Sequence, residues 1–209
     1  MAQNPTPMLL RFSPTSPFAR KVLVLAEDIG LREQIQLVPT NPWAADTDLP
    51  ACNPLGMVPA LGLGSGEWLY DSPVICAYLD SLHSGRRRIP DNGPSRWTAL
   101  RRQALGDGLM EAGLKLRIET TMRPAALRWA DWCARQDAKI RRALQALEGE
   151  VLTFPREDWT IGEITIAVAL GYLDFRWPGH DWLRDCPQLA VWSEHQKTRP
   201  CLQSTMPVE

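Results

Sequence analysis

The chain has 209 residues, of which 44% are apolar and 22% charged, and its formal net charge at pH 7 is -1. This balance is typical of a folded protein in water and excludes the strongly basic surface by which proteins bind nucleic acids or anionic membranes. No stretch is long and apolar enough to predict a membrane span, and Met1–Pro5 has neither the basic nor the apolar region of a signal peptide. We therefore expect a cytoplasmic protein.

The five cysteines and three histidines are widely spaced and include no C-x-x-C pair. Neither a disulfide framework nor a zinc site is predicted from this spacing. We expect no metal.

Strand and helix signals alternate from residue 8 to about residue 83. The strands are predicted at residues 8–12, 35–38, 58–63 and 67–70. Apolar residues at helical spacing from Val22 to Ile29 predict a helix that ends at Gly30. Ser16 is its predicted N-cap, and Pro17 suits the first helical position because a proline has no N–H to leave unpaired.

A second helix is predicted to begin at Pro73 with Ser72 as its cap. The residues predicted on its buried side are Val74, Ile75, Tyr78, Leu79 and Leu82. These signals together predict a small α/β domain with mixed strands over residues 8–83.

Residues 84–95 combine Gly, Pro and charge, which predicts a linker. Its Arg86–Arg88 run is interpreted as a solvated segment rather than an anion site. From residue 96 to residue 209 the pattern is helical, with long helices predicted at about 97–123 and 127–147. Thr160–Glu163 fits a capping box before a buried helix, and a last helix is predicted at Pro187. This second domain is predicted to be an all-α helical bundle.

Three motifs in the first domain, taken in order, resemble those of the glutathione S-transferases. Thr15–Phe18 resembles the Ser-Pro-Phe or Cys-Pro-Phe segment of the tau- and omega-like classes. Asn53–Leu61 is similar to the N-P-x-G-x-V-P-x-L segment with its cis proline, and Asp71–Ile75 to the E/D-S-x-x-I segment. Asp107–Gly113 resembles bacterial members. The resemblance implies a thioredoxin-like domain followed by a helical domain, the glutathione transferase fold.

The resemblance also implies a binding site for glutathione as cosubstrate. Its residues are Phe18, Met57, Val58, Pro59, Asp71 and Ser72. A cis Val58-Pro59 bond would present the Val58 amide and carbonyl to the backbone of an extended peptide. Ser72 and the first amides of its helix suit a carboxylate, and Asp71 suits an ammonium group. Met57 replaces a lysine that is common in the family.

The catalytic hydroxyl is assigned first to Ser16, with Thr15 second and Ser13 third. Serine cannot form the mixed disulfide that a cysteine forms at this position in omega-like proteins. Glutathione itself is therefore the implied nucleophile, with Ser16 donating a hydrogen bond to its sulfur.

A small hydrophobic electrophile is the implied second substrate, bound between the domains. The candidate residues for its pocket are Met110, Leu114, Arg117 and Trp177, with Phe18 beside them. The family further implies a homodimer with a role in detoxification. The leading hypothesis is a glutathione S-transferase. The alternatives are a non-catalytic binding or regulatory protein of the same fold and a glutathione-dependent isomerase, lyase or dehalogenase.

Overall fold

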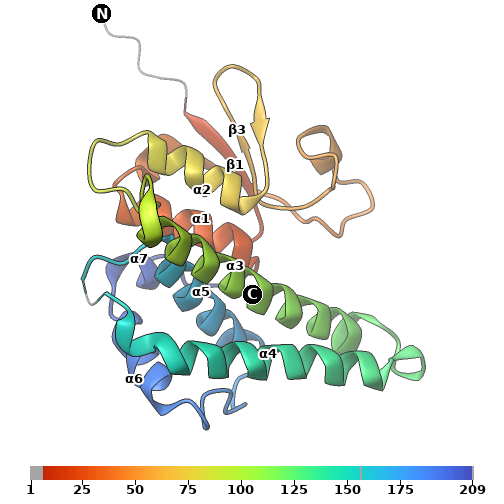
Figure 1. Ribbon diagram of the computed structural model, residues 1–209. Coiled ribbons are helices and arrows are strands. Elements are labelled where there is room, and N and C mark those ends of the chain that lie inside the picture. The colour runs from red at the N-terminus through yellow and green to blue at the C-terminus, as the bar shows by residue number, and fades with distance from the viewer. Residues whose placement is uncertain (1–6, 156, 209) are drawn as a thin grey trace, which may run out of the picture. The chain divides into compact units, whose positions relative to one another are not determined.

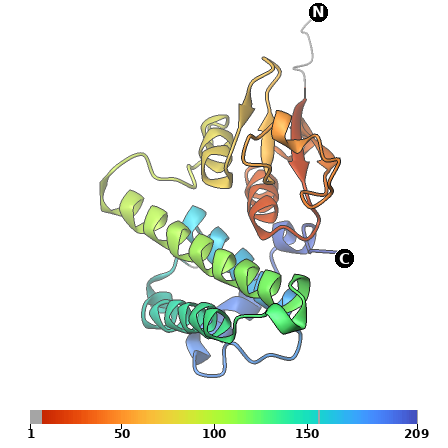
Figure 2. The ribbon, with the colours of Figure 1, turned by 90° about the vertical axis from the view of Figure 1, so that its right-hand side faces the viewer.

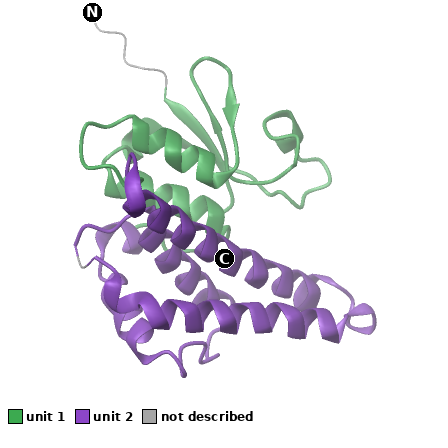
Figure 3. Ribbon diagram, viewed as in Figure 1, with its two compact units in different colours: residues 1–89, 204–209 green, residues 90–203 purple. Residues whose placement is uncertain are grey.

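The computed structural model of the chain describes residues 7–155 and 157–208. Met1–Pro5, on which the expectation about a signal peptide depends, lie outside the described residues. The chain forms two compact units, one made of the residues up to Ile89 together with those from Ser204 onward, the other of Pro90–Gln203 (Figure 3). The predicted linker at 84–95 thus includes the end of the first unit and the first residues of the second.

The first unit contains a four-stranded sheet and two helices (Figure 1). Its elements are β1 (Met8–Phe12), α1 (Pro17–Asp28), η1 (Arg32–Gln34), β2 (Ile35–Pro39), η2 (Leu49–Ala51), β3 (Ala60–Gly62), β4 (Trp68–Leu69) and α2 (Ser72–Ser81). The strand order is β2-β1-β3-β4. Strand β1 is parallel to β2, and the β1–β3 and β3–β4 pairs are antiparallel, so the sheet is mixed as predicted.

The core of this unit follows from the periodicity of its elements. Met8 and Leu10 alternate toward the buried face of β1, while α1 buries its apolar side from Val22 to Ala26. Helices α1 and α2 pack against each other beside the sheet (Figure 2). Helix α1 stops where Gly30 takes a φ of +72°, a conformation that glycine adopts without a steric penalty.

The prediction for α2 was wrong in two details. Ser72 is the first helical residue rather than the cap, and Asp71 occupies the N-cap position without a side-chain capping bond. Proline is accommodated at either of the first two helical positions, because neither N–H has an intrahelical partner, so Pro73 did not determine the boundary. Val74 and Leu82 are exposed rather than buried.

The end of the first unit is held by Asp80, which is buried. Its carboxylate accepts the main-chain N–H groups of Arg88 and Ile89 at 2.8 and 3.0 Å. The Arg88 Nε lies 2.5 Å from the Asp28 carboxylate at the end of α1. Arg88 is therefore anchored, and the interpretation of the whole arginine run as solvated was wrong for this residue.

The second unit consists of helices. Its elements are α3 (Gly93–Arg117), the π-helical turn η3 (Ile118–Met122), η4 (Ala125–Leu127), α4 (Ala130–Glu150), η5 (Val151–Thr153), α5 (Ile161–Arg176), α6 (Pro187–Gln196) and α7 (Pro200–Gln203). Helix α5 is the buried centre, with Ile164 and Leu173 in the core. The short helix α7 was not predicted from the sequence.

Helices α3 and α5 approach closely because glycines lie at the crossing. A Cβ atom on Gly162 would come within 2.8 Å of the Ala99 carbonyl oxygen, and one on Gly106 within 2.8 Å of the Thr165 Cγ2. The predicted capping box is confirmed. The Thr160 hydroxyl accepts the Gly162 N–H at 3.2 Å, while the Glu163 carboxylate accepts the Thr160 N–H at 2.7 Å.

Glu163 also forms a buried ion pair with α3. The Arg102 Nη1 donates to the Glu163 carboxylate at 2.7 Å, its Nε lies 3.3 Å from the Glu150 carboxylate, and its Nη2 donates to the Thr153 hydroxyl at 2.6 Å. The guanidinium also lies 4.3 Å from the centre of the Phe154 ring. The side chains of Arg102 and Glu163 are almost fully buried. Each of these charges has lost its hydration, and the opposite charge beside it offsets that cost.

Candidate functional site

Register brings the first two motifs to one end of the sheet. Strand β1 runs toward Ser13–Ser16, which follow its last residue. In antiparallel β3, Ala60 lies opposite Arg11. Val58, two residues before Ala60, therefore lies beyond the end of β1, beside the turn that leads into α1.

The third motif reaches the same end through β4. Leu69 of β4 lies opposite Leu61 of β3, and the two strands are antiparallel. Asp71 and Ser72, which follow β4, therefore lie next to Pro59. The sheet thus gathers all three motifs, which are separated by up to about 55 positions in the chain, at one end of its strands. Helices α1 and α2 begin at this end, which we call the sheet edge.

Ser16 is the cap of α1, as predicted. Its hydroxyl oxygen accepts the Ala19 N–H at 3.3 Å, and its own N–H donates to the Ser13 carbonyl at 3.0 Å. The hydroxyls of Ser13 and Thr15 lie 3.4 Å apart. The side chain of Ser16 is partly exposed. Its O–H hydrogen is not used by the Ala19 bond, because Ser16 is the acceptor there, so this hydroxyl can still donate to a ligand.

The turn before Val58 is built by one buried side chain. The Asn53 Oδ1 accepts the Leu55 N–H at 3.0 Å, and its Nδ2 donates to the Met57 carbonyl at 2.8 Å. Gly56 takes a φ of +62°, which allows the chain to reverse between them. The Val58-Pro59 peptide bond that follows is cis.

Exposure alternates from residue to residue along this edge, irrespective of polarity. Met57 is 52% exposed and Val58 is partly exposed, whereas Pro59 is buried. Asp71 is exposed at the start of α2, and Ser72 beside it is buried. The Tyr70-Asp71 peptide bond is also cis.

Arg11 supports this edge and was missed in the sequence. Its guanidinium forms an ion pair with Asp48 and donates to the Thr40 hydroxyl at 2.8 Å. One of its terminal nitrogens lies 3.9 Å from the Cys52 sulfur. The hydrogen bond from Arg11 is the main cause that lowers the pKa of Asp48. This arginine joins β1 to the segment that enters the Asn53 turn. Arg11 and Asp48 are too far apart in the sequence for a local motif to predict their contact.

Two family comparisons match this organisation. Residues 15–82 match the glutathione S-transferase N-terminal domain, and residues 130–195 match the glutathione S-transferase C-terminal domain. The chain belongs to the glutathione S-transferase family. Its four-stranded mixed sheet followed by a helical unit agrees with the fold expected for that family.

Individual relatives cover nearly the full length. The chain is 34% identical over 202 residues to the uncharacterized GST-like protein YibF of Escherichia coli, spanning 96% of this chain and 98% of the relative. A glutathione transferase family member from Pseudomonas fluorescens, crystallised with bound glutathione, is 42% identical with a TM-score of 0.91. That match covers 97% of this chain and 100% of the other. A second crystal structure, also from Pseudomonas fluorescens, contains S-(propanoic acid)-glutathione and gives 41% identity, a TM-score of 0.89 and the same coverage.

The four residues predicted for an electrophile pocket all lie in the helical unit of this transferase family member. Met110 is completely buried in its core, whereas Leu114, Arg117 and Trp177 are partly exposed. The Trp177 ring meets Tyr172 edge to face, with centroids 6.5 Å apart. Burial raises the pKa of the Tyr172 hydroxyl, although a hydrogen bond from Arg176 and the charges of Arg176 and Arg117 work against that rise. The assignment of Met110, Leu114, Arg117 and Trp177 to an electrophile pocket remains a prediction.

The described part of the chain adds two further observations. No group of three or more His, Cys, Asp or Glu side chains lies close enough together in it to hold a metal ion. None of its helices combines the length and the apolar character needed to cross a membrane.

Proposed function

We propose that the protein is a glutathione S-transferase, in which glutathione bound at the sheet edge attacks a small electrophile. The observation that most supports this proposal is the Ser16 hydroxyl at the N-terminus of α1, which is partly exposed and able to donate a hydrogen bond. The turn made by Asn53 and the start of α2 lie at the same edge. These are the groups that the three parts of a thiol tripeptide require.

Each part of glutathione has a proposed partner. The main chain of Val58 pairs with the cysteinyl backbone, while Ser72 and the first amides of α2 hold the γ-glutamyl carboxylate. Asp71, exposed at that helix end, receives the ammonium group. Phe18, Pro59 and Met57 complete the proposed contact surface. The relatives with bound glutathione and S-(propanoic acid)-glutathione support retained binding of this ligand.

Ser16 is the proposed activating residue. Its hydroxyl donates to the glutathione sulfur and favours the thiolate form, which is made when the thiol gives its proton to water. Lowering the thiol pKa from about 8.5 by two units requires about 2.7 kcal/mol, within reach of one charge-assisted hydrogen bond together with a helix N-terminus. The thiolate then forms the new carbon–sulfur bond, and the electrophile either releases a leaving group or takes up a proton.

The test is a titration of bound glutathione across pH, following thiolate absorbance in wild type and Ser16→Ala. We expect the depressed thiol pKa to return toward that of free glutathione in Ser16→Ala, with binding largely retained. Ser13→Ala and Thr15→Val are the matched controls, since they remove the two neighbouring hydroxyls. An unchanged pKa in Ser16→Ala together with a shift in a control would transfer the role to that control residue.

A second candidate is a non-catalytic binding or regulatory protein, favoured by Met57. Its thioether is exposed, and it replaces the lysine that the family resemblance implies would meet a ligand carboxylate. Absence of glutathione binding in the same titration would support this candidate. We further propose that the protein is cytoplasmic and that it forms a homodimer. Sedimentation velocity of the purified chain tests the homodimer.

A further inference from the structure

The first unit contains a long stretch without basic residues. Residues 33–82, which include β2, β3, β4 and all of α2, contain no lysine, arginine or histidine. The same stretch contains six acidic residues, which are Glu33, Asp46, Asp48, Glu67, Asp71 and Asp80. Every side chain that this stretch contributes to the sheet edge is therefore neutral or negatively charged.

Most basic residues of the first unit lie at the opposite end of its sheet. Arg32 precedes β2, and the basic residues of 83–88 follow α2, whereas β1 and β2 end and α2 begins at the sheet edge. Lys21 is completely buried in α1. Within the described part of this unit, Arg11 and Arg20 are the two cations that remain near the sheet edge.

Arg11 is committed to the segment of residues 40–57, which joins β2 to β3 and which we call the loop segment. Arg11 forms an ion pair with Asp48 and donates to the Thr40 hydroxyl at 2.8 Å, and its side chain is 13% exposed. It thereby balances one of the two acids of the loop segment, while the other, Asp46, is exposed. Arg20 is partly exposed in the first turns of α1.

The proposed binding mode directs one end of glutathione to the loop segment. The cysteinyl backbone pairs antiparallel with Val58, so the residue after the cysteine lies opposite the residue before Val58. The glycyl end is therefore directed toward Met57, and the γ-glutamyl end toward Pro59 and α2. Figure 1 shows the loop segment, in orange, projecting from the sheet before the chain enters β3.

The surface at the glycyl end is apolar and acidic. Leu55 and Met57, on either side of Gly56, are 63% and 52% exposed. A free carboxylate placed there loses part of its hydration without gaining an opposite charge, and the acids of the loop segment repel it. A neutral amide avoids both costs. A positively charged amide is in addition attracted to the exposed Asp46.

Building on the proposed function, we propose that the preferred thiol of this protein is a glutathione whose glycyl carboxylate is joined to an amine as an amide. The amide removes the negative charge, and an amine that carries a second, positive group adds attraction to the loop segment. The thiol, Ser16 and the γ-glutamyl contacts are the same for free and amidated glutathione. The two ligands therefore differ only at Met57 and the loop segment.

The experiment is calorimetric titration of the full chain with three thiols: glutathione, its neutral glycinamide form and its cationic N-(2-aminoethyl)amide. We expect the neutral amide to bind roughly threefold more tightly than glutathione, and the cationic amide roughly threefold more tightly again, each step being the size of a partly exposed charge interaction. Binding of none of the three would mean that the proposed function itself is wrong. Tighter binding of glutathione than of both amides would overturn only the preference for amides.

Met57→Lys tests the charge at the glycyl end. The added ammonium group should reverse the order, so that glutathione binds more tightly than the neutral amide. Val191→Lys is the matched control, because it adds the same charge at a position of α6 that is 72% exposed, and it should leave the order unchanged. Equal effects of the two lysines would show that the net charge of the protein sets the preference, and would overturn the assignment to the glycyl end.

Arg20→Gln tests the remaining cation near the sheet edge. We expect the ratio of the affinities for the neutral amide and for glutathione to stay unchanged in this variant. A selective loss of affinity for glutathione would mean that Arg20 holds the glycyl carboxylate, and the preference for amides would then be wrong.

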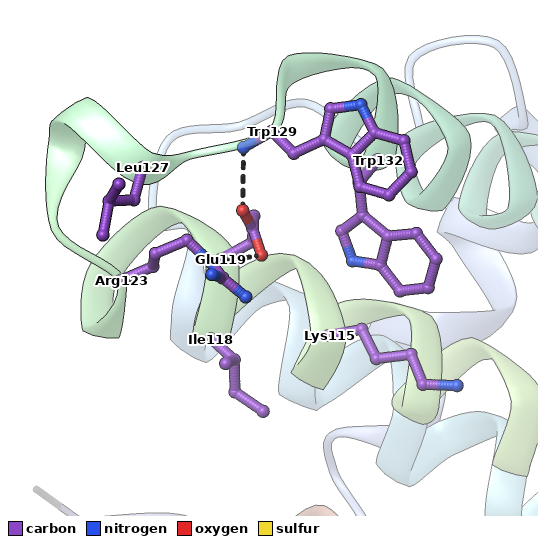
Figure 4. A pocket seen from close by; sticks show the side chains of 7 residues that line it. All are labelled: Lys115, Ile118, Glu119, Arg123, Leu127, Trp129 and Trp132. Carbon is purple, nitrogen blue, oxygen red and sulfur yellow. Dashed lines mark hydrogen bonds and ion pairs between the residues drawn. The ribbon is translucent and has the colours of Figure 1, made fainter.

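The helical unit has a cavity where a carboxylate does find basic residues. The cavity has a volume of about 400 Å³ and lies where α3 passes into η3 and where α4 begins (Figure 4). Lys115 and Arg123 line it, and its buried Glu119 accepts from the Arg123 Nε at 2.9 Å. The titrations are therefore repeated in Lys115→Gln, where we expect no change. A fall in affinity for glutathione alone would place its glycyl carboxylate in this cavity and overturn the assignment to Met57.

Discussion

The two units use polar side chains in different ways. In the first, Ser16 and Asn53 bond to main-chain groups of tight turns, and Asp71 remains exposed. In the second, Arg102 and Glu163 are buried and bond to each other. Polar groups held by turns keep donors and acceptors for a ligand, whereas buried charges use theirs for the fold. We therefore expect changes in the first unit to affect glutathione binding as well as stability, and changes in the second to affect stability alone.

The largest effect is expected for Glu163→Ala. It removes the closer of the two carboxylate partners of the buried Arg102 guanidinium, leaving Glu150, and half of the capping box of α5. Removing one partner of a buried ion pair costs about 3–5 kcal/mol, and because Glu150 still pairs with Arg102, the free energy of unfolding should fall by about 3 kcal/mol. Urea denaturation monitored by circular dichroism measures it, and glutathione affinity of the folded fraction should stay within about twofold.

Glu111→Ala is the matched control, since it breaks an exposed Glu–Lys pair on α3. Its cost should be no more than about 0.5 kcal/mol. Equal losses in the two variants would contradict the distinction between buried and exposed charge on which the comparison rests.

Much of the fold could be predicted because its signals are local. The strand of residues 8–12, the Ser16 cap and the Thr160–Glu163 box each depend on residues within one turn or strand. The three motifs of the sheet edge were recognisable for the same reason, since each is short and continuous. The structure adds the register that brings them together.

The features missed in the sequence all depend on distant partners. Arg11 and Asp48 are 37 positions apart, and Arg102 and Glu163 are 61 apart. The cavity beside Glu119 requires the turn of η3 and the return of the chain to Trp129. Even locally, Ser72 and Asp71 are equivalent choices for the start of α2, because a proline fits either of the first two helical positions.

Asn53→Ala tests the first unit. It removes two hydrogen bonds of a buried turn and leaves the Met57 carbonyl without its donor. The free energy of unfolding should fall by about 2 kcal/mol, and the Kd for glutathione should rise by about tenfold as Val58 loses its fixed position. Both are measurable by denaturation and by calorimetric titration.

The control is Asn41→Ala, which removes a similar side-chain bond to the Trp43 N–H in an exposed turn of the same unit. We expect a loss of no more than about 0.5 kcal/mol and no change in glutathione affinity. A larger stability loss in Asn53→Ala than in Glu163→Ala, with normal glutathione binding in Asn53→Ala, would reverse the roles assigned to the two units.

The smallest effect is a pH dependence in the second unit. Burial of Glu150 tends to raise the pKa of its carboxyl, but the hydrogen bond from Arg101 and the charges of Arg102 and Arg101 outweigh it, so the pKa is lowered from 4.5. A carboxyl with a lowered folded pKa stabilises the protein above its unfolded pKa, and this contribution is lost as the pH falls through the folded value. Wild type should therefore exceed Glu150→Gln by about 1 kcal/mol at pH 7, and the difference should vanish as the pH falls below 4.5. Glu33→Gln, which removes an exposed carboxylate of η1, should show no such convergence, and a difference for Glu150→Gln that persists to low pH would show that shape rather than charge holds Arg101 and Arg102 in place.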